Sequence, residues 1–389
     1  MQTKTSLKRK KENRNAGDDC YSKDFCACLS KSLDLLGYSQ DMIQYRREKN
    51  KQFDEIHNSK GFSVINVTAG GKDPNHVMID INGLQINKQD KIGPAARYGN
   101  TFTNYDFVLG FECFCPDLIE KWVRRSRHHG WPDPDLIKII STLEGHVVPV
   151  ANKGSNFPVT EWRICYTKAE LLLMQSLTDS QTKLYVLLKL ITKSLLHPLC
   201  SAMTSYIMKN VVLWMVETNP KETFSQNSLI DKLLEALLYL KQCLQSNILK
   251  SYMIAERNLL EGRIPENERK LLLKRVDEMI NERENLLQHC TKIHLSLNKM
   301  KDSPEDFIKE AMKRDEIEKL VLKKNIIFKE TESTYETAVS VQNLLNQNAT
   351  YVKYEEQLQT LIIPDKKDFV KQGDNCDDIF RCRLFNILS

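Results

Sequence analysis

The segment TEWRICYTKAE, residues 160–170, gathers several side chains that can contact a ligand. Successive side chains of a β-strand point to opposite faces, so a strand here separates apolar from polar residues. The apolar face carries Trp162, Ile164 and Tyr166, and the polar face carries Arg163, Cys165 and Thr167, with Glu170 just beyond. A guanidinium, a thiol, a hydroxyl and a carboxylate in this order predict one wall of a ligand pocket. A half-exposed edge strand is the alternative.

Two other segments carry side chains of similar chemistry. In YDFVLGFECFC, residues 105–115, alternation points Asp106 away from the apolar face of the strand. Farther along, Tyr206 and Lys209 are three residues apart and share one face of a helix, with Ser205 beside them and Lys189 on the preceding helix. The alternatives are an ordinary strand-start residue for Asp106, a core position for Tyr206 and a solvated helix edge for Lys189.

The elements that must position these residues fall into two regions. Residues 29–56 are predicted to form a helix interrupted at Gly37. Residues 61–168 alternate between strands, turns and two short helices. The predicted strands are GFSVINV, HVMIDI, YDFVLGFECFC, GHVVPV and EWRICYT. From about residue 169 the apolar period changes to that of helices, and no glycine occurs between Gly262 and Gly373. The last third of the chain is therefore predicted to be almost entirely helical.

This pattern predicts an α+β fold of two lobes with a cleft between them, in which a mixed β-sheet lobe precedes an all-helical lobe. We divide the chain into a disordered basic tail at 1–20, a sheet lobe at 21–168, a helical lobe at 169–295 and a helical extension at 296–389. The helices of the extension are expected to pack loosely on the body or to stand free, with 363–389 irregular.

Composition excludes some function classes. Of 389 residues, 41% are hydrophobic and 28% charged, which is typical of a soluble globular protein. The net charge of +5 comes entirely from residues 1–14, so the rest of the chain is not a strongly basic nucleic-acid-binding body. The KRKK run predicts a solvated tail, with a nuclear import signal or a nucleic-acid arm as alternatives. No apolar stretch is long enough to span a bilayer. We expect a cytoplasmic protein, with a nuclear location as the alternative.

The 11 cysteines follow no repeated spacing and no signal peptide precedes them, which predicts reduced thiols. Cys113 and Cys115 together with His128 and His129 offer zinc-binding side chains. Both cysteines fall on the apolar face of a predicted strand, so we expect no zinc site.

The order of several motifs resembles the Mab-twenty-one (Mab-21) family, which includes cyclic GMP–AMP synthase and its receptor-like animal relatives. The motifs are YDFVLGFECF, a helix running into HHGWP, GHVVPVANKGSNFPVTEWRICYTKAE, LYVLLKLITK and TSYIMKNVVLW. The resemblance covers about residues 60–295, extends weakly through LGYSQDMIQYRREKN and is strongest to a mollusc-type branch. It implies a nucleotidyltransferase fold, in which two Mg²⁺ ions held by three carboxylates align two nucleotides.

The resemblance also implies a role for each candidate residue. Asp106 matches the third metal-binding carboxylate, and Arg163 matches an arginine that contacts a nucleobase. Thr167 and Cys165 occupy positions where active synthases have serines. Glu170 matches an acceptor for a base or ribose, and Lys189 matches a phosphate contact. Ser205, Tyr206 and Lys209 match residues that hold phosphate and stack on a base.

One expected feature of an active enzyme is missing. The family places a Gly-Ser turn and an acid-x-acid pair upstream of the third carboxylate. The nearest segment, TAGGKDPNHVMIDING, has Asp80 but an asparagine, Asn82, in place of the second acid, and it lies too close to Asp106 along the chain. We therefore expect Mg²⁺ to bind weakly or not at all.

Three function classes follow. The favoured one is a degenerate family member, a pseudoenzyme that binds ATP, GTP or double-stranded RNA or DNA as a sensor or regulator in innate-immune-type signalling. Its nucleic-acid contacts would come from basic residues at a helix end, which the helix dipole alone also favours: Arg124, Arg125 and Arg127. The alternatives are an active Mg²⁺-dependent enzyme that makes a cyclic dinucleotide, and a scaffold that binds a protein partner through its helical extension. No class involves a membrane.

Overall fold

The computed structural model describes most of the helical part of the chain and short pieces of the rest. The described residues are 16–59, 67–68, 78–79, 95–99, 104–108, 111–113, 115–148, 150, 163–332, 338–363, 380, 383, 384 and 387. Most of the predicted disordered tail, residues 1–15, lies outside them. Helix α2 begins at Ala16, inside the predicted tail.

The chain opens with two long helices joined by a sharp kink. Helix α2 (Ala16–Leu33) continues into a wide turn, η1 (Asp34–Tyr38), and then into α3 (Gln40–Ser59). Gly37 has a φ of 88°, a left-handed conformation that a residue without a Cβ adopts without strain. The predicted interruption of this helix at Gly37 is confirmed.

The described strands form three small antiparallel sheets. Strand β1 (Val67–Thr68) pairs with β2 (Met78–Ile79), and β3 (Ala95–Gly99) pairs with β4 (Asn104–Val108). The third sheet has the order β5 (Phe111–Cys113), β6 (Gly145–Val148) and β7 (Arg163–Cys165). The segment predicted as one strand over 105–115 therefore contributes to two sheets, because β4 pairs with the preceding β3 whereas β5 pairs with the later β6. A single mixed sheet is not seen among these described strands, and the bilobed arrangement stays a prediction.

Two short helices lie between β5 and β6. Helix α4 is Pro116–Val123 and α5 is Pro134–Ser141. Both begin at a proline, whose fixed φ suits the first helical position. The Asp133 carboxylate accepts from the Leu136 backbone N–H at 2.8 Å and caps the start of α5.

The helical body follows β7 and contains the main hydrophobic core. Its helices are α6 (Thr167–Gln175), α7 (Asp179–Ile191), η2 (Thr192–Leu196), α8 (Ser205–Thr218), η3 (Lys221–Thr223), η4 (Gln226–Ser228), α9 (Leu229–Ser246), α10 (Glu266–Glu282) and η5 (Arg283–His289). Leu184, Leu187 and Ile191 of α7 are fully buried, as the predicted apolar stripe requires. A capping box between Thr178 and Gln181 fixes the start of α7.

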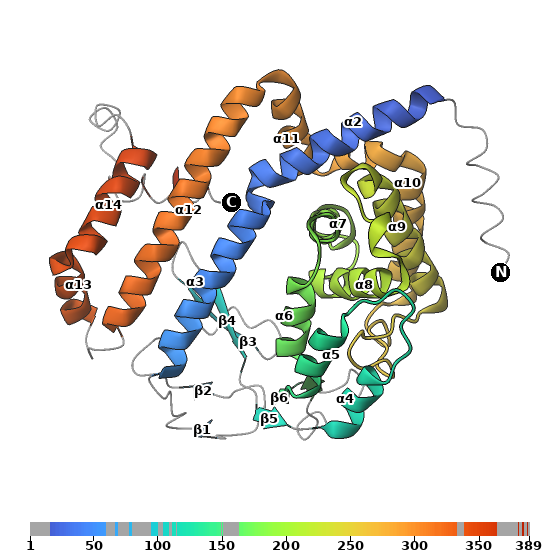
Figure 1. The fold of residues 1–389 in the computed structure, drawn as a ribbon, viewed down its shortest axis with the longest axis horizontal. Helices are drawn as coiled ribbons and strands as arrows, with labels where there is room; N and C mark the ends of the chain where they lie inside the picture. Colours follow the sequence, from blue (N-terminus) through green and yellow to red (C-terminus); the bar gives the residue numbers. More distant parts are fainter. Residues whose placement is uncertain are drawn as a thin grey trace.

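The C-terminal extension consists of α11 (Thr291–Asp302), α12 (Pro304–Glu332), α13 (Ala338–Gln347) and α14 (Ala349–Ile362). The prediction of helices here is confirmed, but the prediction of loose packing is wrong. Helix α12 runs alongside α3 (Figure 1), and Ile317 and Leu320 of α12 are buried in a cluster that includes Leu358 of α14. Leu384, in the segment expected to be irregular, is buried in the same cluster. The extension is therefore packed into this fold, since the apolar side chains of α12 are covered by α14 and α12 also contacts α3.

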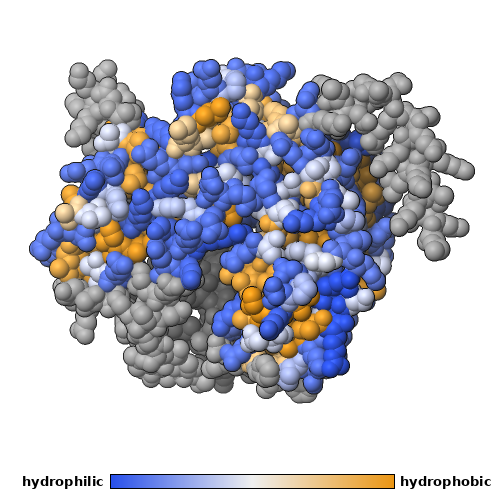
Figure 2. Space-filling view, in the orientation of Figure 1, coloured by the Kyte–Doolittle hydropathy of each residue, from blue (hydrophilic) through white to orange (hydrophobic). Residues whose placement is uncertain are grey.

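The face of the molecule seen in Figure 2 is mainly hydrophilic, with hydrophobic residues in separate small areas. Met312 on α12 is 67% exposed and Leu295 on α11 is 56% exposed. In the portion of the chain that the structure covers, no helix combines the length and the apolar character that a bilayer crossing requires.

Candidate functional site

The junction of β7 and α6 holds the residues singled out first in the sequence. Strand β7 pairs with β6 so that Cys165 lies opposite His146 and Arg163 lies opposite Val148. Opposite residues of an antiparallel pair point to the same face, so Arg163, Cys165 and His146 share one face. The strand ends at Cys165 and α6 begins at Thr167, which corrects the prediction that Thr167 continues the polar face of the strand.

The apolar face of β7 agrees with the alternation. Tyr166 is only 2% exposed and its hydroxyl donates to the Cys115 carbonyl at 3.2 Å. Burial, followed by the nearby thiols of Cys115 and Cys113, raises the pKa of Tyr166 to about 12. Ile164 packs against the same hydrophobic cluster. Trp162 lies outside the described residues.

Glu170 is the centre of the site. Its side chain projects from the first turn of α6 and the residue is only 7% exposed. The carboxylate accepts from the Tyr206 hydroxyl at 3.1 Å and from the Lys209 ammonium at 3.1 Å. Both donors lie on the first turns of α8, and Lys209 lies 5.4 Å from the centroid of the Tyr206 ring. The three-residue spacing thus presents both side chains to one acceptor, as the sequence predicts.

The protonation of Tyr206 suits this hydrogen bond. Burial, followed by the neighbouring negative charge of Glu170, raises the pKa of Tyr206 to about 12. The phenol therefore keeps its proton at physiological pH and donates it to the carboxylate. A carboxylate that is both hydrogen-bonded and ion-paired carries little uncompensated charge in its buried position.

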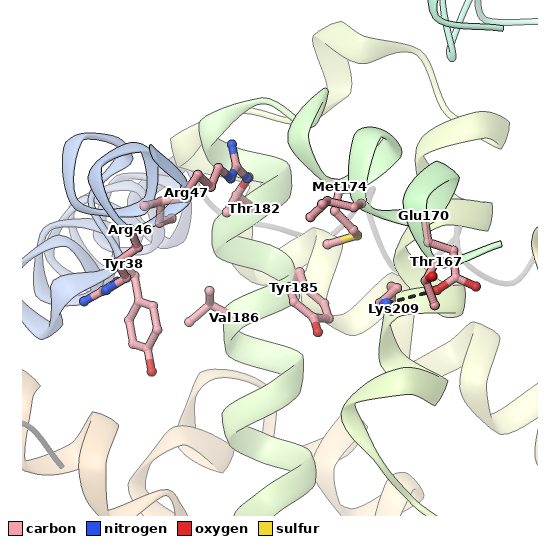
Figure 3. Close-up of a pocket in the computed structure, with 12 residues that line it drawn as sticks. Tyr38, Arg46, Arg47, Thr167, Glu170, Met174, Thr182, Tyr185, Val186 and Lys209 are labelled. Carbon is pink, nitrogen blue, oxygen red and sulfur yellow. Dashed lines mark hydrogen bonds and ion pairs between the residues drawn. The ribbon is translucent and has the colours of Figure 1, made fainter. Parts of the chain in front are cut away.

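A cavity of about 570 Å³ lies beside Glu170. Its walls come from η1 and α3 on one side and from α6, α7 and α8 on the other, as Figure 3 shows. The lining residues are Tyr38, Ile43, Arg46, Arg47, Thr167, Glu170, Leu171, Met174, Thr182, Tyr185, Val186 and Lys209. Aromatic and apolar side chains together with a few charged groups form a lining that can hold a small molecule.

Helix α3 contributes two cations that the sequence analysis did not single out. Arg46 forms an ion pair with Glu318 of α12 and donates to the Gly37 carbonyl at 2.5 Å. Arg47 has no hydrogen-bonding or ion-pair partner within the described part of the chain, and burial lowers the pKa of its guanidinium. Their signal in the sequence is the pair of arginines in SQDMIQYRREKN, a segment noted only for the entry of the helix into the domain.

The other predicted ligand residues differ in their position relative to this cavity. Burial raises the pKa of Tyr185, a lining residue, and Ser205 partly offsets this effect. Lys189 lies one helical turn beyond Tyr185 on α7, is exposed and does not line the cavity. Asp106 lies in β4 opposite Arg97 in the register, and its side chain is outside the described part of the structure. The site therefore brings together Thr167, Glu170, Ser205, Tyr206 and Lys209 but not Lys189.

The Arg163 Nε is buried and has no hydrogen-bond partner among the residues that the structure describes. Burial, followed by the positive charge of Arg163, lowers the pKa of Arg263. Arg257 and Arg263 were not singled out in the sequence, because they lie in a stretch without helical or strand periodicity.

The three arginines expected at a nucleic-acid surface have different environments. Arg124 is exposed, with a side chain 76% accessible, and pairs with Glu120 one turn away. Arg125 and Arg127 both reach the buried carboxylate of Glu217, at 2.8 and 3.2 Å. The Arg125 guanidinium also lies 4.4 Å from the Trp214 ring, and that of Arg127 lies 4.5 Å from the Trp122 ring. Arg125 and Arg127 are therefore held inside the fold, and only Arg124 is presented to solvent.

Metal ligands are scarce in the parts of the chain that the structure describes. No group of three or more His, Cys, Asp or Glu side chains is found there that could hold a metal ion. Cys113 and Cys115 have their sulfur atoms 3.1 Å apart, while His128 and His129 are exposed on the loop after α4. Since the Asp106 carboxylate is outside this part, Mg²⁺ binding stays a prediction.

Part of the helical body matches a protein-family model. Residues 180–278 match the model of the Mab-21 protein HhH/H2TH-like domain. The matched segment begins in α7, ends in α10 and contains Tyr206 and Lys209, whereas Glu170 lies outside it, on the preceding helix α6.

Proposed function

We propose that this chain, which belongs to the Mab-21 family through its helical domain at residues 180–278, binds a nucleotide such as ATP or GTP beside Glu170 without catalysing nucleotidyl transfer. The match supports a relationship to the cyclic GMP–AMP synthase-like nucleotidyltransferases. The ligand, the lack of catalysis and a regulatory role in innate-immune-type signalling are proposals.

The observation that carries the proposal is the set of contacts around Glu170. A buried carboxylate held by Tyr206 and Lys209 forms one edge of a cavity whose other walls carry Tyr38, Tyr185 and Arg47, which has no partner among the described residues. Aromatic rings stack on a base, and cations contact phosphate. A buried carboxylate accepts hydrogen bonds from the exocyclic amine of a base or from a ribose hydroxyl.

The proposal excludes catalysis on chemical grounds. A two-metal reaction needs several protein oxygen ligands to fix both ions against the phosphates, and Asp106 is the only one of the three family carboxylates found in the sequence. Asp106 alone would hold at most one largely hydrated Mg²⁺. Stacking and phosphate contacts require no metal, so binding survives the loss of the other acids.

The remaining function classes have less support. An active enzyme making a cyclic dinucleotide needs the upstream acids. Binding of double-stranded RNA or DNA rests on Arg124 alone among the three candidate arginines, because Arg125 and Arg127 pair with Glu217. A free-standing helical scaffold is disfavoured by the burial of Ile317 and Leu320 of α12, although the outer faces of α13 and α14 still offer a surface for a protein partner.

Calorimetric titration of the purified full-length chain with ATP and GTP, with and without Mg²⁺, tests the binding. We expect saturable binding in the micromolar to millimolar range, equal to roughly 4–8 kcal/mol. Tyr206→Ala, which removes the ring and a Glu170 partner, should weaken binding about tenfold or more. Lys221→Ala, at an exposed position away from the cavity, should leave it unchanged. Absence of binding to both nucleotides would contradict the proposal.

Catalysis is tested separately. The protein is incubated with ATP, GTP, Mg²⁺ or Mn²⁺ and double-stranded RNA or DNA, and the products are separated by chromatography. We expect no cyclic or linear dinucleotide. A product that disappears with Asp106→Ala would establish an active enzyme instead.

A further inference from the structure

Cys113 and Cys115 form a pair of thiols that the candidate site does not use. Their sulfur atoms lie 3.1 Å apart, at hydrogen-bonding distance, and both are half-buried free cysteines. In an extended strand, residues two positions apart are separated by roughly 6–7 Å. Here β5 ends at Cys113 and α4 begins at Pro116, so the chain leaves the strand direction and the two thiols can meet.

This contact distinguishes the pair from the other cysteines of the described residues. No other hydrogen bond there joins two cysteine side chains, and four of the remaining cysteines are buried: Cys26, Cys200, Cys243 and Cys290. Cys165 is half-buried like the pair, but its sulfur contacts only the Arg163 carbonyl, at 3.9 Å. Closeness and partial exposure are therefore combined in Cys113 and Cys115.

We propose that Cys113 and Cys115 are a reversible oxidation site, which hydrogen peroxide converts to an intramolecular disulfide and a thiol such as glutathione reduces again. The S–S bond of a disulfide is about 2.05 Å long, so the two sulfur atoms need to approach by only about 1 Å. A loop closed between residues two positions apart is strained, and strained disulfides are readily reduced. In a reducing compartment, disulfides of this kind are transient and sense the redox state.

The reaction has two steps. The hydrogen bond with Cys113, followed by burial, raises the pKa of Cys115, so we assign the attacking thiolate to Cys113. This thiolate attacks one peroxide oxygen, the O–O bond breaks, and a sulfenic acid and hydroxide form. The Cys115 sulfur then attacks the Cys113 sulfur, the S–O bond breaks, and the leaving oxygen takes the Cys115 proton. Two thiols and one peroxide thus give one disulfide and two waters.

The pair lies where three elements of the fold meet. The Cys115 carbonyl accepts from the Tyr166 hydroxyl at 3.2 Å and from the Ile119 backbone N–H of α4 at 3.3 Å. Gly145 lies opposite Cys113 in the register of β5 and β6, and a Cβ there would meet the Tyr166 ring at 3.2 Å. Because there is so little free space, closing the disulfide shifts the Cys115 backbone against Tyr166. We expect both hydrogen bonds to the Cys115 carbonyl to weaken.

Peptide mass spectrometry tests the oxidation site. Trypsin releases residues 98–121 as one peptide, in which Cys113 and Cys115 are the only cysteines. The full-length protein is treated with hydrogen peroxide, denatured and alkylated with iodoacetamide. We expect this peptide to carry no alkyl group and to be lighter by two hydrogen atoms, at a peroxide dose that leaves Cys165 alkylated. Dithiothreitol added before alkylation should restore both alkyl groups.

Serine variants test the assignment of the two sulfur atoms. In Cys115→Ser the sulfenic acid has no thiol to react with, so dimedone, which traps sulfenic acids, should label Cys113. In Cys113→Ser, Cys115 should remain alkylated at the same peroxide dose. Cys165→Ser, on the neighbouring strand β7, is the matched control and should leave the disulfide unchanged. Alkylation of both cysteines in peroxide-treated wild type, or a disulfide to a third cysteine, would overturn the proposal.

Hydrogen exchange measures the effect on the neighbouring helices. We expect the Ile119 amide, whose acceptor is the Cys115 carbonyl, to exchange faster in the oxidised protein than in the reduced one. The amides of α9 serve as the control and should not change. Equal exchange of Ile119 in both states would refute the coupling between the disulfide and α4. None of these measurements uses a nucleotide, so their outcome is independent of the proposed function.

Discussion

Arg46 of α3 and Glu318 of α12 form a two-point ion pair, although 272 residues separate them in the chain. The Arg46 Nη2 donates to Glu318 Oε2 at 2.7 Å, its Nε donates to the other carboxylate oxygen, and its Nη1 donates to the Gly37 carbonyl. Because Arg46 also lines the cavity, helix α12 of the C-terminal extension helps to fix one wall of the candidate site.

Replacing Glu318 tests this coupling. Glu318→Gln removes the charge from a pair whose side chains are 30% and 19% exposed, and we expect a loss of about 1–2 kcal/mol in the free energy of unfolding. Nucleotide affinity should fall several-fold because Arg46 is no longer held. Denaturant unfolding and calorimetric titration measure the two effects. Glu310→Gln on the same helix breaks only an exposed contact with Lys299 and should change neither quantity.

Gly37 should tolerate no side chain. A Cβ at Gly37 would meet the Arg46 guanidinium at 2.9 Å and that of Arg314 at 3.0 Å, and its φ is 88°. Gly37→Ala is expected to cost about 2–3 kcal/mol of stability from strain and from displacement of both guanidinium groups. Gly130→Ala has a similar φ of 69° but nothing within 4 Å, so it isolates the backbone strain at about 1 kcal/mol. Equal losses in the two variants would show that the guanidinium contacts contribute nothing.

Glu217 should be among the most sensitive polar positions in the fold. Its carboxylate accepts from the Tyr252 hydroxyl at 2.7 Å as well as from Arg125 and Arg127, and the residue is 5% exposed. Glu217→Gln leaves two guanidinium groups without their counter-charge, so we expect a loss of about 3–5 kcal/mol in unfolding experiments. Arg124→Ala, at the exposed neighbour, should change stability by less than about 0.5 kcal/mol. Retention of full stability by Glu217→Gln would refute the structural role of the two arginines.

The extension should be required for a stable fold. A chain ending before Pro304 lacks α12 and the buried side chains of Phe307, Ile317 and Leu320, each worth about 1.5–3 kcal/mol when buried. We expect a lower melting temperature and a broader unfolding transition, measured by circular dichroism, together with weaker nucleotide binding. An unchanged melting temperature would show that the rest of the chain does not need the extension for its stability.

Tyr206 should contribute to stability in a pH-dependent way. Its pKa is about 12 in the fold against 10.0 for an unperturbed tyrosine, so the unfolded chain releases this proton first as the pH rises. The contribution is fully present below about pH 10 and is lost as the pH approaches about 12, with a size of at most about 2–3 kcal/mol. Tyr206→Phe should therefore lose less stability than wild type over this interval. If the curves of unfolding free energy against pH were parallel for wild type and Tyr206→Phe, the raised pKa of Tyr206 would be contradicted.

Local patterns predicted the local structure well. The kink at Gly37, the alternation of Ile164 and Tyr166, and the shared face of Tyr206 and Lys209 depend on neighbours a few residues apart. Such features follow from the periods of helices and strands. The start of α6 at Thr167 was missed because TEWRICYT continues the strand alternation past the point where the helix begins.

The partners of charged residues were not predictable in the same way. Arg125 and Arg127 read as a basic surface because their acceptor, Glu217, and the ring of Tyr252 come from distant segments. Arg46 and Glu318 are likewise paired only by the tertiary fold. Sequence periodicity identifies which face of a helix is polar, but whether that face meets solvent or a buried carboxylate depends on packing between elements far apart in the chain.

The docking of α12 on α3 has a consequence for the order in which the protein folds. While the chain is being synthesised, α3 and the kink at Gly37 emerge long before Glu318 does, and Arg46 has no counter-charge until then. Contacts between segments this far apart form late, because closing a long loop carries an entropic cost. We therefore expect the nascent chain to acquire its helical body first and to complete the cavity wall only after α12 leaves the ribosome.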